Sequence, residues 1–214
     1  MRKRQPNSKQ GSADMVIFKR FFHMVAIFAC AAFVAGCGTA SKPFASRSLK
    51  ADQGRKMALL SFDNLSKTQG AGKSMENMIL TEFLKSSPVT IVDPGEVAAA
   101  LSEERVRLAT SIPRETIMNL GKKLGVDLFM VGIVHEYEMQ MASGTGGSGQ
   151  IPVIAITLRI VDAASGDIVW AINASRTGND KETVFGIGKI QSLNTLADDT
   201  AKQIARSFAD SLKK

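Results

Sequence analysis

The chain has 214 residues, of which 27 are Lys or Arg and 20 are Asp or Glu, giving a formal net charge of +7. Six basic residues and one acidic residue precede Cys37, which leaves 21 basic and 19 acidic residues and a net charge of only +2 in the remaining chain. Because the basic excess is concentrated in this first segment, and no basic run with interleaved aromatics follows it, the composition argues against a nucleic-acid partner.

The first predicted element is a signal peptide over residues 1–36. A basic start, the apolar run Phe21–Phe33 and a short run of small residues follow one another in the order typical of secretory signals. The stretch Val34-Ala35-Gly36-Cys37 resembles the lipobox of bacterial lipoproteins, which predicts that Cys37 is acylated with fatty chains such as palmitate and becomes the first mature residue. The weaker alternative is a transmembrane helix, but the apolar run is shorter than the roughly 20 residues that a span needs.

Lipidation at Cys37 would determine both the location and the redox state of the mature chain. Cys30 lies within the predicted signal, so no cysteine remains for a disulfide and the domain must fold on its core alone. In lipoproteins of this type an Asp after the cysteine commonly marks inner-membrane retention, so Gly38 favours the periplasmic face of the outer membrane. The true start is open between Met1 and Met15, because a compact basic region follows Met15.

Residues 37–55 are predicted to be the lipidated cysteine and a flexible tether, since this stretch is rich in Ser, Lys and Ala. A structured domain is predicted over residues 56–214. It begins with a buried strand at Met57–Phe62 and a helix at Lys73–Ser86, where Met75, Met78 or Ile79, and Phe83 recur at helical spacing.

Two further helices are predicted after a short strand at Val89–Val92. Asp93-Pro94-Gly95-Glu96 has the pattern of a helix start, with Asp93 as N-cap, and this helix is expected to run to about Val106. The next helix is expected to begin at Pro113 and to end at Gly125.

The second half of the domain is predicted to be strands followed by a terminal helix. Asp127–Met141 alternates, which places Phe129, Val131, Ile133, His135, Tyr137 and Met139 on one face. A Gly/Ser-rich hairpin loop at Gly144–Gly149 and strands at Ile151–Asp162 and Asp167–Arg176 follow. Leu193–Lys213 is an amphipathic helix that buries Ala201, Ile204, Phe208 and Leu212. The predicted fold is therefore α/β (α+β), a mixed β-sheet packed with helices.

Gly70-Ala71-Gly72-Lys73-Ser74 suggests a phosphate-binding loop, because Gly-Lys-Ser ends such loops between a strand and a helix. The full loop needs a glycine five residues before Gly72, and Lys67 stands there. A helix-capping loop is therefore the favoured interpretation, and nucleotide binding through Gly70–Ser74 is a weaker alternative.

The remaining chemical candidates also favour structural interpretations. His135 is the only histidine after Cys37, and no Cys/His cluster exists for zinc. Glu136 and Glu138 share a strand face about 7 Å apart, a spacing that is usual for a solvated surface. Gly186-Ile187-Gly188-Lys189 is expected to form a bend before the last helix. We therefore expect a chain that is not an enzyme, without catalytic, cofactor-binding or metal-binding residues.

Four segments together resemble the CsgG-type family, whose named member forms the curli secretion channel. They are Met57–Leu65, Gly125–Gly132, Ile156–Trp170 and Gly186–Ile190, and the turn Val161-Asp162…Gly166-Asp167-Ile-Val-Trp170 is the most specific. The resemblance covers nearly all of the mature domain and implies an envelope lipoprotein with a periplasmic domain. The same fold resembles that of lipoprotein activators of penicillin-binding proteins and of the N-terminal TolB domain.

The chain departs from that family at two places. The secretion channel carries two long membrane-crossing hairpins per subunit, whereas the corresponding stretches here are Met139–Gln150, a short Gly/Ser turn, and Arg176–Ser192, which is short and charged at its centre. The expected function is therefore a lipid-anchored, non-catalytic binding or assembly factor for an envelope machine such as a secretion apparatus, a surface appendage or a cell-wall synthase. Cys37 is the single predicted functional residue. The alternative is an oligomeric channel subunit, and the envelope partner cannot be named from the sequence.

Overall fold

The structure is a computed structural model that describes residues 42–49, 54–106, 108–141, 149–183 and 186–213. The predicted signal peptide and the lipobox with Cys37 lie outside the described residues, as does most of the predicted Gly144–Gly149 loop. The strands are β1 (Phe44–Ala45), β2 (Lys56–Leu59), β3 (Asp63–Asn64), β4 (Thr90–Ile91), β5 (Leu128–Met141), β6 (Gln150–Asp162) and β7 (Ile168–Thr177). The helices are α2 (Ala71–Ser86), α3 (Pro94–Glu103), α4 (Arg114–Leu124) and α5 (Leu193–Ser211), with a short 3₁₀ turn, η1, at Ala109–Ser111.

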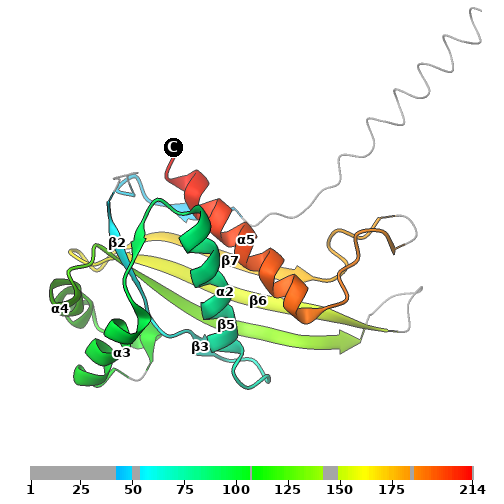
Figure 1. Ribbon diagram of the computed structural model, residues 1–214, viewed down its shortest axis with the longest axis horizontal. Helices are drawn as coiled ribbons and strands as arrows, with labels where there is room; N and C mark the ends of the chain where they lie inside the picture. The colour runs from blue at the N-terminus through cyan, green and yellow to red at the C-terminus, as the bar shows by residue number, and fades with distance from the viewer. Residues whose placement is uncertain (1–41, 50–53, 107, 142–148, 184–185, 214) are drawn as a thin grey trace, which may run out of the picture. The chain divides into compact units, whose positions relative to one another are not determined.

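The strands form one mixed sheet in the order β1-β7-β6-β5-β2-β4, and β3 pairs with β5 off this path (Figure 1). β5, β6 and β7 are consecutive antiparallel strands, whereas β2 pairs in parallel with both β4 and β5. The antiparallel part follows from the two short connections between long alternating strands, and the parallel part from the helical crossovers between β2 and β5. The predicted mixed sheet with packed helices is confirmed.

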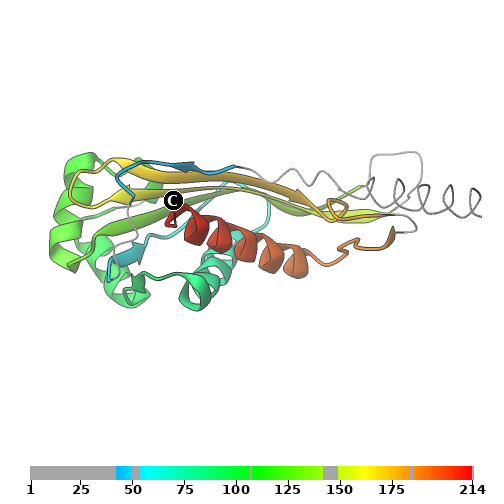
Figure 2. The same ribbon diagram turned by 90° about the horizontal axis from the view of Figure 1, so that it is seen from above.

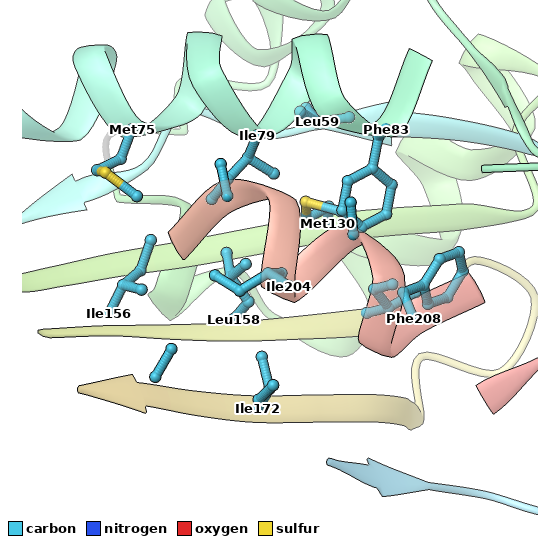
Figure 3. Packing of buried hydrophobic residues seen from close by; sticks show 14 of the residues in the cluster. Leu59, Met75, Ile79, Phe83, Met130, Ile156, Leu158, Ile172, Ile204 and Phe208 are labelled. Atoms are coloured by element: carbon cyan, nitrogen blue, oxygen red, sulfur yellow. The ribbon is translucent and has the colours of Figure 1, made fainter. Parts of the chain in front are cut away.

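One face of the sheet is covered by α2 and α5, which lie on the same side of it (Figure 2). Their apolar side chains point toward β5, β6 and β7, as Figure 3 shows for Ile79, Phe83, Ile204 and Phe208. The ring of Phe208 stacks on Phe83 at 5.3 Å and meets Trp170 edge to face at 5.5 Å. These aromatic contacts add about 0.5–1.5 kcal/mol each beyond the burial of the rings, so they join both helices to β7.

The opposite face is only partly covered. α3 and α4 pack over β2 and the beginning of β5 through a smaller apolar cluster that includes Leu60, Leu120 and Phe129. Beyond this cluster, no described helix covers the rest of the face formed by β5, β6 and β7 (Figure 2). We call this part the open sheet face, and define it by His135, Ala155, Thr157, Arg159, Ala171, Asn173 and Ser175.

The predicted helix boundaries are largely confirmed, because they depend on local chemistry. The Asp93 carboxylate accepts hydrogen bonds from the backbone N–H groups of Gly95 (2.8 Å) and Glu96 (3.3 Å), as an N-cap does. Gly125 ends α4 with a φ of 61°, a conformation that favours glycine. The expectation that the helix opened by Asp93 runs to about Val106 is wrong, since α3 ends at Glu103.

The predicted single face along β5 is also wrong beyond its middle. The register shifts between Val134 and Glu136, so His135 has no partner on β6 and the alternation inverts after it. Tyr137 is therefore buried on the α5 side, where its hydroxyl group donates to Asn194 at 3.3 Å, whereas Phe129 packs against α3 and α4. A β-bulge has no clear signature in a single alternating sequence, which explains the error.

The predicted tether differs from the structure at its described part. Phe44–Ala45 forms β1 and pairs antiparallel with β7, and Ser46 N–H donates to the Val169 carbonyl at 2.8 Å. Leu49 is only 7% exposed and belongs to the main core. The sheet edge supplies backbone partners that composition does not reveal, so the domain includes residues 44–49 as well as the predicted range from residue 56.

Candidate functional site

The Gly70–Ser74 stretch forms the beginning of α2. Gly70 precedes the helix with a φ of 77°, and a Cβ atom on Gly72 would lie 2.5 Å from the Phe62 carbonyl oxygen. Lys73 is paired with the buried Glu76 carboxylate at 2.7 Å. The close approach of Gly72 therefore serves helix–loop packing, and the lysine that a phosphate would need already has a partner. This geometry favours the structural interpretation over nucleotide binding.

The second glycine pair forms the predicted bend before α5. Gly186 and Gly188 have φ values of 75° and 87°, and a side chain on Gly188 would collide with the Lys181 carbonyl. Ile190 N–H donates to the Gly178 carbonyl at 2.8 Å, which holds the end of this connection against the end of β7. These glycines are explained by backbone geometry.

His135 lies on the open sheet face, where it belongs to a row of hydrogen-bonded side chains. Its Nε2 is 2.9 Å from the Thr157 hydroxyl group, which in turn donates to the Asn173 amide oxygen at 2.9 Å. Because the Thr157 hydrogen points to Asn173, His135 Nε2 acts as the donor to Thr157. The row crosses β5, β6 and β7, so it links three strands by side chains on a solvent-facing surface.

The two glutamates lie on the same side of β5 as predicted. Glu138 accepts a hydrogen bond from Gln140 at 3.0 Å and lies 4.0 Å from Lys67. Glu136 pairs across the ladder with Ala155. The Glu138 carboxylate is thus engaged by neighbouring surface side chains, an arrangement that fits the predicted solvated strand face.

A charged network at the end of β7 was not anticipated from the sequence. The Arg176 side chain is only 8% exposed, and its guanidinium group donates to Asp180 (2.7 Å), Asp199 (3.1 Å) and Gln203. Lys181 adds a second cation to Asp199 at 2.9 Å. The network joins β7, the connection after it and α5. Arg176 continues the alternation of the buried Ile172 and Ala174 along β7, so the period-two pattern of a strand could have predicted that its side chain points inward.

The two carboxylates of this network are held in their charged forms. Partial burial by itself raises the pKa of Asp180, but the hydrogen bonds donated by Thr177 and Arg176 outweigh it and hold the pKa below its ordinary value. Burial acts in the same way on Asp199, and the hydrogen bond and charge of Lys181, together with Arg176, lower the pKa of this group. The network is therefore a structural clamp at neutral pH.

A groove of about 650 Å³ lies beside the C-terminal end of α4. Its two acidic side chains are engaged in local structure, because Asp127 accepts from Lys56 N–H at 2.8 Å and Asp162 accepts from Ser165 N–H at 2.8 Å. Over the described part of the chain, no group of three or more His, Cys, Asp or Glu side chains is placed to hold a metal ion. The same residues include no helix with the length and apolar character of a membrane span.

Several strand edges, including parts of β5 and β7, lack a strand partner among the described residues. β2 and β3 cover β5 only as far as Val134, and β1 covers β7 only at Trp170 and Ala171. Unpaired strand edges offer backbone N–H and C=O groups to another chain. The open sheet face and these edges of β5 and β7 are thus among the surfaces of the described domain that are suited to binding protein.

Comparisons with known proteins agree with this architecture. A family model described as "Curli production assembly/transport component CsgG" matches residues 41–207. No curated protein matches the chain.

Several solved structures have a similar fold. Two structures of the PelC dodecamer from Paraburkholderia phytofirmans, the first of them of a single-residue variant, superpose with TM-scores of 0.53 and 0.50 at 18% and 19% identity, covering 78% of this chain and 97% and 95% of that chain. Lipoprotein GNA1162 from Neisseria meningitidis has a TM-score of 0.49 at 16% identity, covering 71% of this chain and 99% of that chain. The LpoB C-terminal domain from Salmonella enterica has a TM-score of 0.45 at 10% identity, covering 61% and 87%.

Proposed function

Because the chain belongs to the CsgG family, whose model matches residues 41–207, we propose that it is a lipid-anchored, non-catalytic assembly factor of the bacterial envelope. It acts on the periplasmic face of the outer membrane, where it is held by fatty chains on Cys37. The family match carries this proposal, since it spans almost the whole domain and its description names an assembly and transport component.

The described surface supports a binding role. The charged side chains around Arg176 form ion pairs within their own cluster, and Glu138 lies beside Lys67. The exposed features include a polar open sheet face and unpaired strand edges, and surfaces of this kind are suited to binding other polypeptides. We therefore propose that the chain works by binding protein in the envelope, including further copies of itself.

The lipid anchor is tested by replacing the acylated residue. Cys37→Ser should leave unprocessed, unlipidated precursor, which is visible as a larger band and as loss of labelling with radioactive palmitate. Each buried CH₂ of an acyl chain contributes about 0.8 kcal/mol, so the wild-type chain should sediment with outer-membrane vesicles. A Cys37→Ser chain that remains wholly in the outer-membrane fraction would refute the anchor.

The partner is tested by crosslinking in intact cells. Purification of the full chain after crosslinking should recover a defined envelope complex. Recovery of only free monomer, with normal localisation, would refute the assembly role. Cys37→Ser serves as the control for proximity to the membrane.

A second candidate function is a ring-forming channel subunit. The fold shared with a dodecameric protein favours it. Conductance across planar bilayers separates the two candidates: stable current steps support the channel, and their absence at concentrations where the oligomer is intact supports the assembly factor.

A further inference from the structure

We infer that the groove beside the C-terminal end of α4 binds a short zwitterionic peptide. Arg55 binds the carboxylate end of this ligand, and Asp162 binds its ammonium end. The site goes beyond the proposed assembly role, which concerns the binding of envelope proteins, and neither depends on the other.

Four segments of the chain line the groove. They are the residues just before β2, the C-terminal half of α4, the beginning of β5 and the turn after β6. The volume of about 650 Å³ lies within the range of about 300–1,000 Å³ that is usual for ligand sites. α4 meets the turn closely at Gly121, where a Cβ atom would lie 2.7 Å from the Ala163 Cβ atom, so small residues form this part of the groove.

Two cations line the groove without a carboxylate partner. Arg55 is half-buried and Lys122 is exposed, and neither forms an ion pair with a residue that the structure describes. The adjacent Lys123, by contrast, is paired with Glu103. A guanidinium group without a carboxylate partner is suited to binding one, because its fork of N–H groups matches a carboxylate in two parallel hydrogen bonds.

The two carboxylates of the groove each retain one oxygen atom for a ligand. Asp127 Oδ2 accepts from Lys56 N–H at 2.8 Å, and Asp162 Oδ1 accepts from the N–H groups of Ala164 (3.1 Å) and Ser165 (2.8 Å). The other oxygen of each carboxylate accepts no hydrogen bond from a described residue. Because the bound oxygens fix the orientation of both groups, the remaining oxygens are preorganised acceptors for an ammonium group or a peptide N–H.

The strand order separates the two signs of charge. Arg55 directly precedes β2, Asp127 directly precedes β5 and Asp162 ends β6, and these strands lie side by side in this order. Neighbouring strands are about 4.8 Å apart, so about 10 Å separates the β2 side from the β6 side. An extended peptide spans at most about 3.3–3.6 Å per residue, so a ligand of about three residues connects the two sides.

Backbone hydrogen bonds fix the strand ends that carry these charges. Thr90 N–H donates to the Arg55 carbonyl, Asp127 N–H donates to the Lys56 carbonyl and Ala163 N–H donates to the Asp127 carbonyl, each at 2.9 Å. Charged groups on rigid elements lose less conformational freedom on binding, so the groove is preorganised for its ligand.

Trialanine tests the site, because it carries both charges and its small apolar side chains suit the lining by Met118 and Val126. Isothermal titration calorimetry measures its binding to the full lipidated chain in detergent micelles. Trialanine amide and N-acetyl-trialanine each lack one charge. We expect each of them to bind about tenfold more weakly or worse, since each loses a charge-assisted hydrogen bond.

Two charge-removing variants show which end of the peptide binds where. Arg55→Gln should abolish the preference for trialanine over trialanine amide and keep the preference over N-acetyl-trialanine. Asp162→Asn keeps an oxygen that can accept from Ser165 N–H, and it should abolish only the preference over N-acetyl-trialanine. Arg47→Gln is the matched control and should bind like the wild type, because Arg47 is exposed and does not line the groove. Loss of selectivity for one end of the peptide does not arise from unfolding.

The inference would be overturned by an absence of binding at millimolar trialanine or by equal binding of all three peptides. Equal effects of Arg55→Gln and Arg47→Gln would overturn it as well. None of these results bears on the assembly role, which is tested separately by crosslinking in cells.

Discussion

Replacement of Arg176 by methionine should destabilise the domain by about 2–3 kcal/mol at neutral pH. The side chain donates to Asp180, Asp199 and Gln203 while being only 8% exposed. A hydrogen bond to a charged group contributes about 1.5–3 kcal/mol. The full sum does not apply, because the two carboxylates remain about 30% exposed and regain water, and Lys181 still pairs with Asp199. Methionine fills the volume of the arginine stem, which keeps the cavity cost small.

The cost of the Arg176 substitution should depend on pH. The pKa values of Asp180 and Asp199 are lowered in the folded state, so the stabilisation is present above the ordinary carboxyl range. It is lost as the pH falls through the lowered folded values. The difference between wild type and Arg176→Met should therefore be largest near pH 7 and should shrink at pH values below about 4.

Urea unfolding measures this effect through a single internal probe. Trp170 is the only tryptophan and is fully buried, so its fluorescence reports the loss of the core around α5. Arg159→Met is the matched control, because Arg159 is exposed on the open sheet face and its replacement should change stability by less than about 0.5 kcal/mol. The stabilising role of the Arg176 network would be refuted by either of two results. One is a loss of unfolding free energy for Arg176→Met that equals the loss for Arg159→Met at pH 7, and the other is a loss that stays unchanged at acid pH.

Three further substitutions test the packing and the helix starts. Phe208→Ala should cost roughly 3–5 kcal/mol in the same urea assay, since its fully buried ring contacts two other aromatic rings; a loss below about 2 kcal/mol would contradict that packing. Asp93→Ala should cost about 1 kcal/mol and increase amide exchange at the start of α3, whereas Asp93→Asn should be nearly neutral. Gly72→Ala should lower the melting temperature, because the added Cβ atom would collide with the Phe62 carbonyl oxygen. This collision should outweigh the helix propensity of alanine, which exceeds that of glycine by about 1 kcal/mol. A stabilised variant would show that the Phe62 carbonyl can move away from the new side chain.

Elements that depend on neighbours along the chain were predicted from the sequence. The Asp93 N-cap, the Gly125 stop of α4 and the buried stripe of α5 that includes Phe208 follow from local hydrogen bonding and from helical spacing. The resemblance of the segments around Trp170 to the CsgG family is confirmed by the family match, which covers those segments. The acylation of Cys37 stays a prediction.

Features that depend on contacts between distant segments appeared only in the tertiary structure. The bulge at His135 inverts the faces of β5, and the pairing of Phe44 with β7 extends the domain into the predicted tether. The Arg176 clamp joins residues that are up to 27 positions apart.

The sequence by itself determined the type and order of the four described helices and of the long strands, because propensity, capping and periodicity act over a few residues. Only the tertiary structure decided which backbone groups at the edges of β5 and β7 lack partners, because that depends on where β1 and β3 end on the assembled sheet. The proposed binding surfaces are therefore a property of how the strands are assembled.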